Sequence, residues 1–90
     1  MASIRIPTPL RQYADGQTTI TVAGATINEA LADLTDRYPA LHNYLYNGDT
    51  LRSFVNIYLN QEDIRYLDGE KTAISEHDRL LIVPSIAGGM

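Results

Sequence analysis

Stretches of alternating or continuous apolar residues mark four strands along the chain. Within each stretch, the residues expected to face the interior fall at every second position, as in a strand with one buried face. The four stretches are residues 3–6, 19–22, 54–60 and 79–83. A brief fifth strand is expected at residues 64–66, after a turn at residues 60–63.

Between residues 27 and 38 the apolar positions recur with a helical period instead. Ile27, Ala30, Leu31 and Leu34 fall on one stripe of this helix. Just before the stripe, Thr26 and Glu29 form a capping box. We expect the Thr26 hydroxyl to accept from the amide three residues on, and Glu29 to reach back to the Thr26 amide. Pro39 ends the helix, because the residue before a proline disfavours helical geometry.

The remaining segments are shorter and more polar. Residues 7–16 hold two prolines and an Asp-Gly pair, so they are expected to form a loop and a turn between the first two strands, which then pair antiparallel. A short helical turn after Pro39 carries Leu41 and Leu45. Another helical turn is expected at Ala73-Ile74, followed by a loop.

This order of elements predicts an α+β fold of the ubiquitin-like β-grasp kind. A mixed four- to five-stranded sheet packs on one main helix. We expect one β-grasp domain over residues 1–84 and a flexible C-terminal tail over residues 85–90. The predicted core is Ile4, Ile6, Ile20, Val22, Ile27, Leu31, Leu34, Val55, Ile57, Leu59, Leu80 and Ile82.

Composition excludes several classes of protein. The chain has 90 residues and a formal net charge of −4, and its seven basic residues are scattered along the sequence without forming a basic stripe, so no nucleic-acid partner is expected. The absence of cysteine removes disulfides and thiolate chemistry. No apolar run is long enough to span a membrane and no signal peptide is evident, so a cytoplasmic location is expected.

No set of residues has the spacing of a catalytic or metal site. His42 and His77 lack partner ligands nearby in the sequence and are expected to be exposed loop histidines. No Ser-His-Asp pattern indicates a nucleophile. The paired carboxylates are expected to lie on solvated surfaces; they are Asp33 with Asp36 and Glu62 with Asp63. These observations favour a chain that is not itself an enzyme.

The sequence ends in Gly88-Gly89-Met90, directly after the last strand-like run. Two residues without Cβ atoms can enter a narrow catalytic channel and present an uncrowded carbonyl carbon. Met90 blocks this use, because it carries the free carboxylate. The hypothesis is therefore that cleavage between Gly89 and Met90 frees the Gly89 carboxylate to react. The alternative is a small, inert tail.

A second candidate site lies on the strands. Four apolar residues alternate with the predicted core and are expected to face away from the helix, where they would form a partner-docking patch. They are Phe54, Tyr58, Leu81 and Val83. Ile86, Ala87 and Gly88 would extend this recognition surface toward the end of the tail. The alternative is that neighbouring loops cover the patch.

A β-grasp order that ends in Gly-Gly resembles the ubiquitin-like sulfur carriers of the ThiS and MoaD family. The similarity to the CysO-like branch of that family is closest in residues 52–65, with the sequence RSFVNIYLNQEDIR. Residues 6–11 and 84–89 are also similar to that branch. The resemblance covers nearly the whole chain, and the order of its segments is more specific than any one of them.

The resemblance implies a carrier chemistry performed by other proteins. An E1-like adenylating enzyme would use ATP and Mg²⁺ to activate the carboxylate of Gly89, and sulfur would then displace AMP to leave a thiocarboxylate. A sulfur-accepting biosynthetic enzyme would take the sulfur; in the CysO-like branch it is a pyridoxal-phosphate-dependent cysteine synthase. A JAMM-type zinc metalloprotease would cut between Gly89 and Met90, as for related carriers with residues after the diglycine. The chain itself shows no phosphate-binding motif and is expected to bind no cofactor.

Two other functions use the same fold. The chain could be a ubiquitin-like protein modifier, although Lys71 is its only lysine and chain building through lysine has only that acceptor. It could also be a β-grasp module that binds partners without covalent chemistry. The product of ATP-dependent activation separates the three: a thiocarboxylate, an isopeptide-linked conjugate, or nothing.

Overall fold

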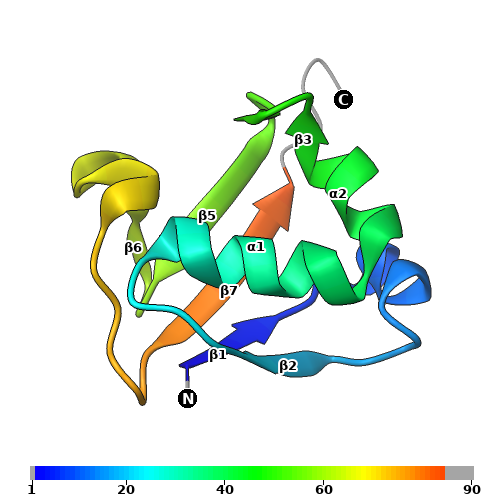
Figure 1. Ribbon diagram of the computed structural model, residues 1–90, viewed down its shortest axis with the longest axis horizontal. Helices are drawn as coiled ribbons and strands as arrows, with labels where there is room; N and C mark the ends of the chain where they lie inside the picture. Colours follow the sequence, from blue (N-terminus) through cyan, green and yellow to red (C-terminus); the bar gives the residue numbers. More distant parts are fainter. Residues whose placement is uncertain (1, 85–90) are drawn as a thin grey trace.

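One long helix crosses a five-stranded mixed sheet in the computed structural model, which describes residues 2–84 (Figure 1). The strand order is β2-β1-β7-β5-β6, and a separate two-stranded sheet pairs β3 with β4. The strands are β1 (Ala2–Arg5), β2 (Thr19–Val22), β3 (Tyr46–Asn47), β4 (Thr50–Leu51), β5 (Val55–Leu59), β6 (Glu62–Asp63) and β7 (Arg79–Pro84). The α-helices are α1 (Ile27–Arg37) and α2 (Pro39–Leu45), and the 3₁₀ helices are η1 (Thr8–Tyr13), η2 (Ile64–Tyr66) and η3 (Gly69–Lys71). This is the β-grasp arrangement that the element order predicts.

The centre of the sheet is held by the pairing of β1 with β7. These strands run parallel, while β1 pairs antiparallel with β2 and β7 pairs antiparallel with β5. The register places Ile20, Ile4 and Leu80 side by side across three strands, and Ile57 opposite Ile82. All five are buried and share one core cluster with the apolar stripe of α1, the helix that crosses the sheet (Figure 1). Burying each such side chain contributes about 1.5–3 kcal/mol, so this inner face is the main source of stability.

The predicted core is confirmed except at Leu59, which is only half-buried. Leu59 ends β5 beside the short edge strand β6, which leaves one side of it open. The structure also buries apolar residues that the strand and helix patterns did not include in that core: Ala2, Leu10, Ala14, Ala30, Leu41, Leu45, Tyr46 and Ile64. Among residues 2–84, no helix has both the length and the apolar character needed to cross a bilayer.

The start of α1 differs in one detail from the predicted capping box. The Thr26 hydroxyl accepts from the Glu29 amide at 3.2 Å, as expected. The Glu29 carboxylate, however, accepts from the Ala25 amide at 2.9 Å and not from Thr26. Thr26 forms an isolated bridge with Ala73, which holds the chain extended before the helix and brings the Ala25 amide to Glu29. The helical turn predicted at Ala73 is therefore wrong, because that residue pairs as a strand does.

The proline-containing segment between β1 and β2 is not the loop that its composition predicts. Residues 8–13 form the 3₁₀ helix η1, since a proline near the start of a helix already has a helical φ. This turn drives Leu10 completely into the core, and Ala14 follows it. The Arg11 guanidinium donates to the Ile6 carbonyl at 3.0 Å and ties η1 to the end of β1.

The return strand predicted at residues 64–66 is also wrong. Asn60 and Gln61 have φ values of 50° and 77°, the geometry of a two-residue type I′ hairpin turn, so the return strand begins directly after them. Residues 64–66 then form η2. The Asp63 carboxylate caps this helix by accepting from the Arg65 amide at 2.8 Å.

Among the glycines of residues 2–84, Gly24 is the one whose replacement should cost most. Its φ is +148°, and a Cβ built on it would lie 2.7 Å from the Glu29 Cβ and 2.8 Å from the Ala30 amide nitrogen. We expect Gly24→Ala to lower the free energy of unfolding by about 3 kcal/mol, from backbone strain and overpacking against α1. Urea unfolding followed by circular dichroism measures the loss.

Gly48→Ala is the matched control. Its φ is +68° and its Cβ would meet no atom within 4 Å, so only backbone strain of about 1 kcal/mol is expected. Equal losses in the two variants would show that the close approach of Gly24 to α1 has no energetic consequence.

Candidate functional site

The face of the sheet opposite α1 carries the apolar residues that the alternation predicted. Tyr58 lies directly across from Leu81 in the β5–β7 pair, and Asn56 lies across from Val83. Leu81 is 36% exposed, while Tyr58 and Val83 are half-buried. The three residues Tyr58, Leu81 and Val83 are called the outer apolar patch below. They form a continuous surface, because cross-strand partners share a face.

Phe54 does not belong to this patch. β5 begins at Val55, so the strand alternation does not extend to Phe54. Its ring packs edge-on against Tyr44 of α2, with ring centroids 5.9 Å apart, and Tyr44 in turn contacts Tyr13 of η1 at 6.3 Å. The expectation that Phe54 shares an outward-facing patch with Tyr58, Leu81 and Val83 is therefore wrong, since its ring packs against Tyr44 and the core.

A polar bracket of Asn56, Asp63 and Arg65 borders the outer apolar patch. The Asn56 side-chain amide donates to the Val83 carbonyl at 3.2 Å, across the β5–β7 pair. The Arg65 guanidinium donates to the Asn56 side-chain oxygen and, at 3.0 Å and 3.3 Å, to the Asp63 carboxylate. The bracket thus connects β6 and η2 through β5 to the last part of β7 that the structure describes.

The charge state of the bracket follows from these contacts. Hydrogen bonds from the Arg65 side chain, and then from its backbone amide, lower the pKa of Asp63 below its usual value. The same pair raises the pKa of Arg65. Asp63 is therefore ionised and neutralised by its neighbour, which makes it a structural group and not a proton donor.

A second clasp holds the start of β7. The Asn60 side-chain oxygen accepts from the Arg79 backbone amide at 2.9 Å. The Asn60 backbone amide donates to the Arg79 carbonyl at 2.8 Å. The Asn60 side-chain nitrogen donates to the Asp78 carboxylate at 3.0 Å, and that carboxylate also accepts from the Ser75 amide at 2.6 Å. These bonds lower the pKa of Asp78, the one from Asn60 contributing most. The β5–β6 turn is thereby fixed to β7.

The predicted histidine positions are corrected in part. His77 is exposed in a loop as expected, but His42 lies in α2, half-buried, with its ring stacked on Tyr46 at 5.0 Å. Burial, with a smaller contribution from Glu70, raises the pKa of Tyr46 to about 12, so its hydroxyl stays protonated at neutral pH. Within residues 2–84, no three His, Cys, Asp or Glu side chains come together as metal ligands.

Two of the carboxylates predicted to be solvated have structural partners instead. Asp33 accepts from the backbone amide that follows β2 at 2.9 Å and pairs with Arg37 at 3.0 Å. Asp63 belongs to the polar bracket. Asp36 and Glu62 are exposed, as expected.

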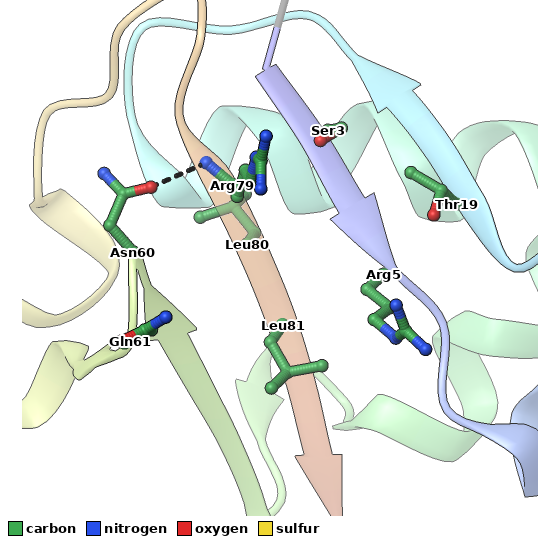
Figure 2. A pocket seen from close by; sticks show the side chains of 8 residues that line it. All are labelled: Ser3, Arg5, Thr19, Asn60, Gln61, Arg79, Leu80 and Leu81. Carbon is green, nitrogen blue, oxygen red and sulfur yellow. Dashed lines mark hydrogen bonds between the residues drawn. The ribbon is translucent and has the colours of Figure 1, made fainter.

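Basic residues that are scattered in the sequence come together on this face. Arg5 and Arg79 lie on the adjacent strands β1 and β7 and line the same hollow, with Leu81 beside them (Figure 2). Their alternation with Ile4 and Leu80 was a usable signal for an outward direction. Their proximity was not visible in the sequence, since it depends on the parallel pairing.

The tail residues expected to serve recognition, cleavage and covalent chemistry lie outside the described part of the chain. Recognition was expected at Ile86, Ala87 and Gly88, cleavage between Gly89 and Met90, and covalent chemistry at Gly89. The description ends at Pro84, which pairs with Val55 at the end of the β5–β7 ladder. The outer apolar patch and the polar bracket are therefore the described surfaces nearest in sequence to that segment.

Comparison with known proteins gives consistent matches over nearly the whole chain. The model of the ThiS family matches residues 4–89. The sulfur carrier protein CysO of Mycobacterium tuberculosis is 37% identical over 90 residues, and the alignment covers 97% of each chain. A chain in the crystal structure of the Amycolatopsis orientalis BexX/CysO complex has a TM-score of 0.90 and 32% identity, with 99% of this chain and 100% of that chain covered. The small archaeal modifier protein 1 of Methanosarcina acetivorans has a TM-score of 0.88 and 30% identity, with 98% and 95% covered.

The depressed carboxyl pKa values predict how stability changes in acid. Because Asp63 and Asp78 titrate lower in the folded chain than in the unfolded chain, their ionised forms stabilise the fold. This contribution is fully present above the pKa of the unfolded chain, about 3.9, and is lost as pH falls through the lower pKa values of the folded chain. Carbon-detected NMR titration of the two carboxyl groups should give midpoints below about 3.9.

Arg65→Gln tests whether the pKa values of Asp63 and Asp78 are lowered by separate sets of contacts. This variant removes the guanidinium that lowers the Asp63 value and leaves the Asn60 and Ser75 contacts of Asp78 in place. The Asp63 midpoint should rise toward its usual value while the Asp78 midpoint stays low. If the titration midpoints of both Asp63 and Asp78 rose, the hydrogen bonds around the two carboxylates would not be independent.

Proposed function

The chain belongs to the ThiS family, and on that premise we propose that it carries sulfur as a thiocarboxylate on Gly89 after Met90 has been removed. The observation that supports this most directly is the extent of the family match, which reaches Gly89 and stops before Met90. The likeness to CysO over nearly the full length of both chains agrees with it.

The chemistry needs activation because a carboxylate is a poor electrophile. Attack of the Gly89 carboxylate on the α-phosphate of ATP releases pyrophosphate and gives an acyl adenylate. A sulfur nucleophile then forms a C–S bond to the acyl carbon while the C–O bond to AMP breaks, and AMP leaves. The sequence has no phosphate-binding glycine-rich loop, so an E1-like enzyme supplies the ATP site and its Mg²⁺. The carrier supplies an acyl group that no side chain crowds.

The outer apolar patch is proposed as the surface that docks on the adenylating enzyme. An exposed group of aromatic and aliphatic side chains is typical of protein interfaces. It lies on β5 and β7, and β7 leads directly into residues 85–89. In this arrangement the adenylating enzyme recognises Ile86, Ala87 and Gly88 in the channel that leads to its active site. The complex of CysO with BexX shows that a related carrier associates with a separate protein.

Two further partners complete the proposal. A JAMM-type zinc metalloprotease cuts the Gly89–Met90 bond before activation. A sulfur-accepting biosynthetic enzyme then takes the sulfur, and the likeness to CysO favours a pyridoxal-phosphate-dependent cysteine synthase for this role. Neither step requires a catalytic group from the carrier itself.

Protein modification is the second candidate function. It is favoured by the likeness to small archaeal modifier protein 1, whose name describes a modifier. The same acyl adenylate could pass to an amine and not to sulfur, which would give an isopeptide bond. The product of activation therefore decides between the two functions.

Intact-mass analysis tests the proposed function. The chain is incubated with the protease, the adenylating enzyme, ATP, Mg²⁺ and sulfide. We expect the mass first to fall by one methionine residue and then to rise by the exchange of one oxygen for sulfur. A variant that ends at Gly89 should skip the first step and react directly.

Gly89→Val, in the background that ends at residue 89, is the control, because a branched side chain crowds the reacting carbonyl. It should give no thiocarboxylate. Efficient thiocarboxylation of the uncut chain would refute the trimming step, and conjugates in place of thiocarboxylate would favour the modifier function.

Leu81→Asp tests the docking surface. A charge on this exposed strand position should weaken binding to the adenylating enzyme by about tenfold or more, since truncation of central interface residues costs over 1 kcal/mol. Tyr66→Asp is the matched control, because Tyr66 is 84% exposed and lies in η2, outside the patch. Urea unfolding confirms that both variants fold. Equal affinity of the two variants for the enzyme would remove the patch from the proposal.

A further inference from the structure

The outer face of the sheet carries positive charge on a chain that is acidic overall. By register, its strand residues include two arginines, Arg5 and Arg79, and one carboxylate, Asp63. Asp63 is already neutralised by Arg65 in the polar bracket. Two positive charges therefore remain unbalanced on this face, although the chain has a formal net charge of −4.

The two arginines share one hollow. It has a volume of about 670 Å³ and opens between β1, the start of β7 and the β5–β6 turn (Figure 2). Arg5 lies opposite Leu81 and Arg79 lies opposite Ser3, so the arginines are diagonal neighbours, with Cα atoms roughly 8 Å apart from strand spacing and rise. The lining also includes Leu80 and Leu81 and four residues with hydroxyl or amide groups: Ser3, Thr19, Asn60 and Gln61.

No carboxylate among residues 2–84 forms an ion pair with either guanidinium group. The carboxylate next in sequence, Asp78, is engaged by Asn60 and by the Ser75 amide. Within residues 2–84, neither Arg5 nor Arg79 has an ion pair, and both are exposed. The clasp from Asn60 fixes the backbone of Arg79 at both its amide and its carbonyl. The hollow therefore combines a fixed backbone with two cationic groups that have no carboxylate partner among residues 2–84.

We propose that this hollow, called the arginine hollow, docks an acidic segment of the adenylating enzyme, with carboxylates of that segment paired to Arg5 and Arg79. Arginine binds carboxylates through paired hydrogen bonds, and the surrounding hydroxyls and amides suit a polar interface rim. A nucleic acid is disfavoured, because two arginines on a net acidic chain supply too few phosphate contacts.

The inference rests on the proposed function in naming the adenylating enzyme as the partner. Leu81 lines the arginine hollow and also belongs to the outer apolar patch, so the two surfaces are continuous. Charges at the rim of an apolar contact orient the approach and raise the association rate, and their effect is screened by salt. The arginine hollow thus determines which way round the carrier meets the enzyme.

The first experiment needs no enzyme. A short peptide of alternating glutamate and glycine is titrated into ¹⁵N-labelled protein, and amide and arginine Nε–H signals are followed. We expect the shifts to cluster on β1, the start of β7 and the β5–β6 turn. Arg5→Glu and Arg79→Glu should each weaken binding by roughly five- to tenfold, the effect of reversing an exposed charge in a pair. Lys71→Glu makes the same change in net charge on η3 and should leave the affinity unchanged.

Each alternative has its own outcome. Weakening by Lys71→Glu equal to that by Arg5→Glu would mean that only net charge matters and would overturn the proposal. Inorganic phosphate that saturates the same signals at the same concentration would indicate a small-anion site and no docking surface. If a single-stranded oligonucleotide bound these residues more tightly than the acidic peptide does, the proposal would be overturned and the ligand of the hollow would be a nucleic acid.

The second experiment uses the adenylating enzyme and separates this inference from the proposed function. All chains in this experiment end at Gly89, so that Met90 does not block activation, and wild type here means that chain without a substitution. In pyrophosphate exchange, Arg5→Glu and Arg79→Glu should raise KM several-fold at low salt, with kcat unchanged, and the difference should shrink as salt is added. If wild type reacts and these variants match Lys71→Glu, the arginine hollow is refuted and the proposed function stands. If no variant reacts, wild type included, the proposed function fails, and the peptide titration still decides whether the hollow binds acidic segments.

Discussion

The parallel pairing of β1 with β7 is the constraint on which the rest of the structure depends. It places the most distant strands of the described chain side by side at the centre of the sheet. Ile4 and Leu80 then meet beneath α1, and neither strand is left as an edge. The same pairing brings Arg5 and Arg79 onto one surface. The centre of the core and the charge on the outer face therefore both depend on this register.

Much of this could be predicted from the sequence, because a sheet with one buried face imposes a two-residue period. That period correctly predicted the four longer strands, the inner core apart from Leu59, and the outward direction of Tyr58 and Leu81. It was wrong at Phe54, because a strand that begins one residue later loses the alternation there. Leu10 was missed because two prolines nearby indicated a loop, although proline can also begin a 3₁₀ helix. The meeting of arginines from two strands depends on topology, which no local pattern contains.

The proposals for this chain separate recognition from chemistry. In them, the outer apolar patch and the arginine hollow supply contact area and orientation, while within residues 2–84 no His, Cys, Asp and Glu side chains gather as a metal site. A chain of 90 residues buries only roughly 60–65% of its unfolded surface, which leaves little room for an enclosed substrate pocket. The proposal that Gly89 carries the reactive group relieves the domain of that demand, and the family match through Gly89 accords with it.

The central position of β7 also has a consequence for biosynthesis. At about 5–20 residues per second, the ribosome needs roughly 4–15 seconds to travel from β1 to β7. During this interval β1 has only its hairpin partner β2, and an isolated hairpin is at best marginally stable in water. A nascent chain interrupted before residue 79 therefore keeps an open strand edge that chaperones and proteases can recognise. The free edge of β1 is therefore closed only in chains that include the last strand.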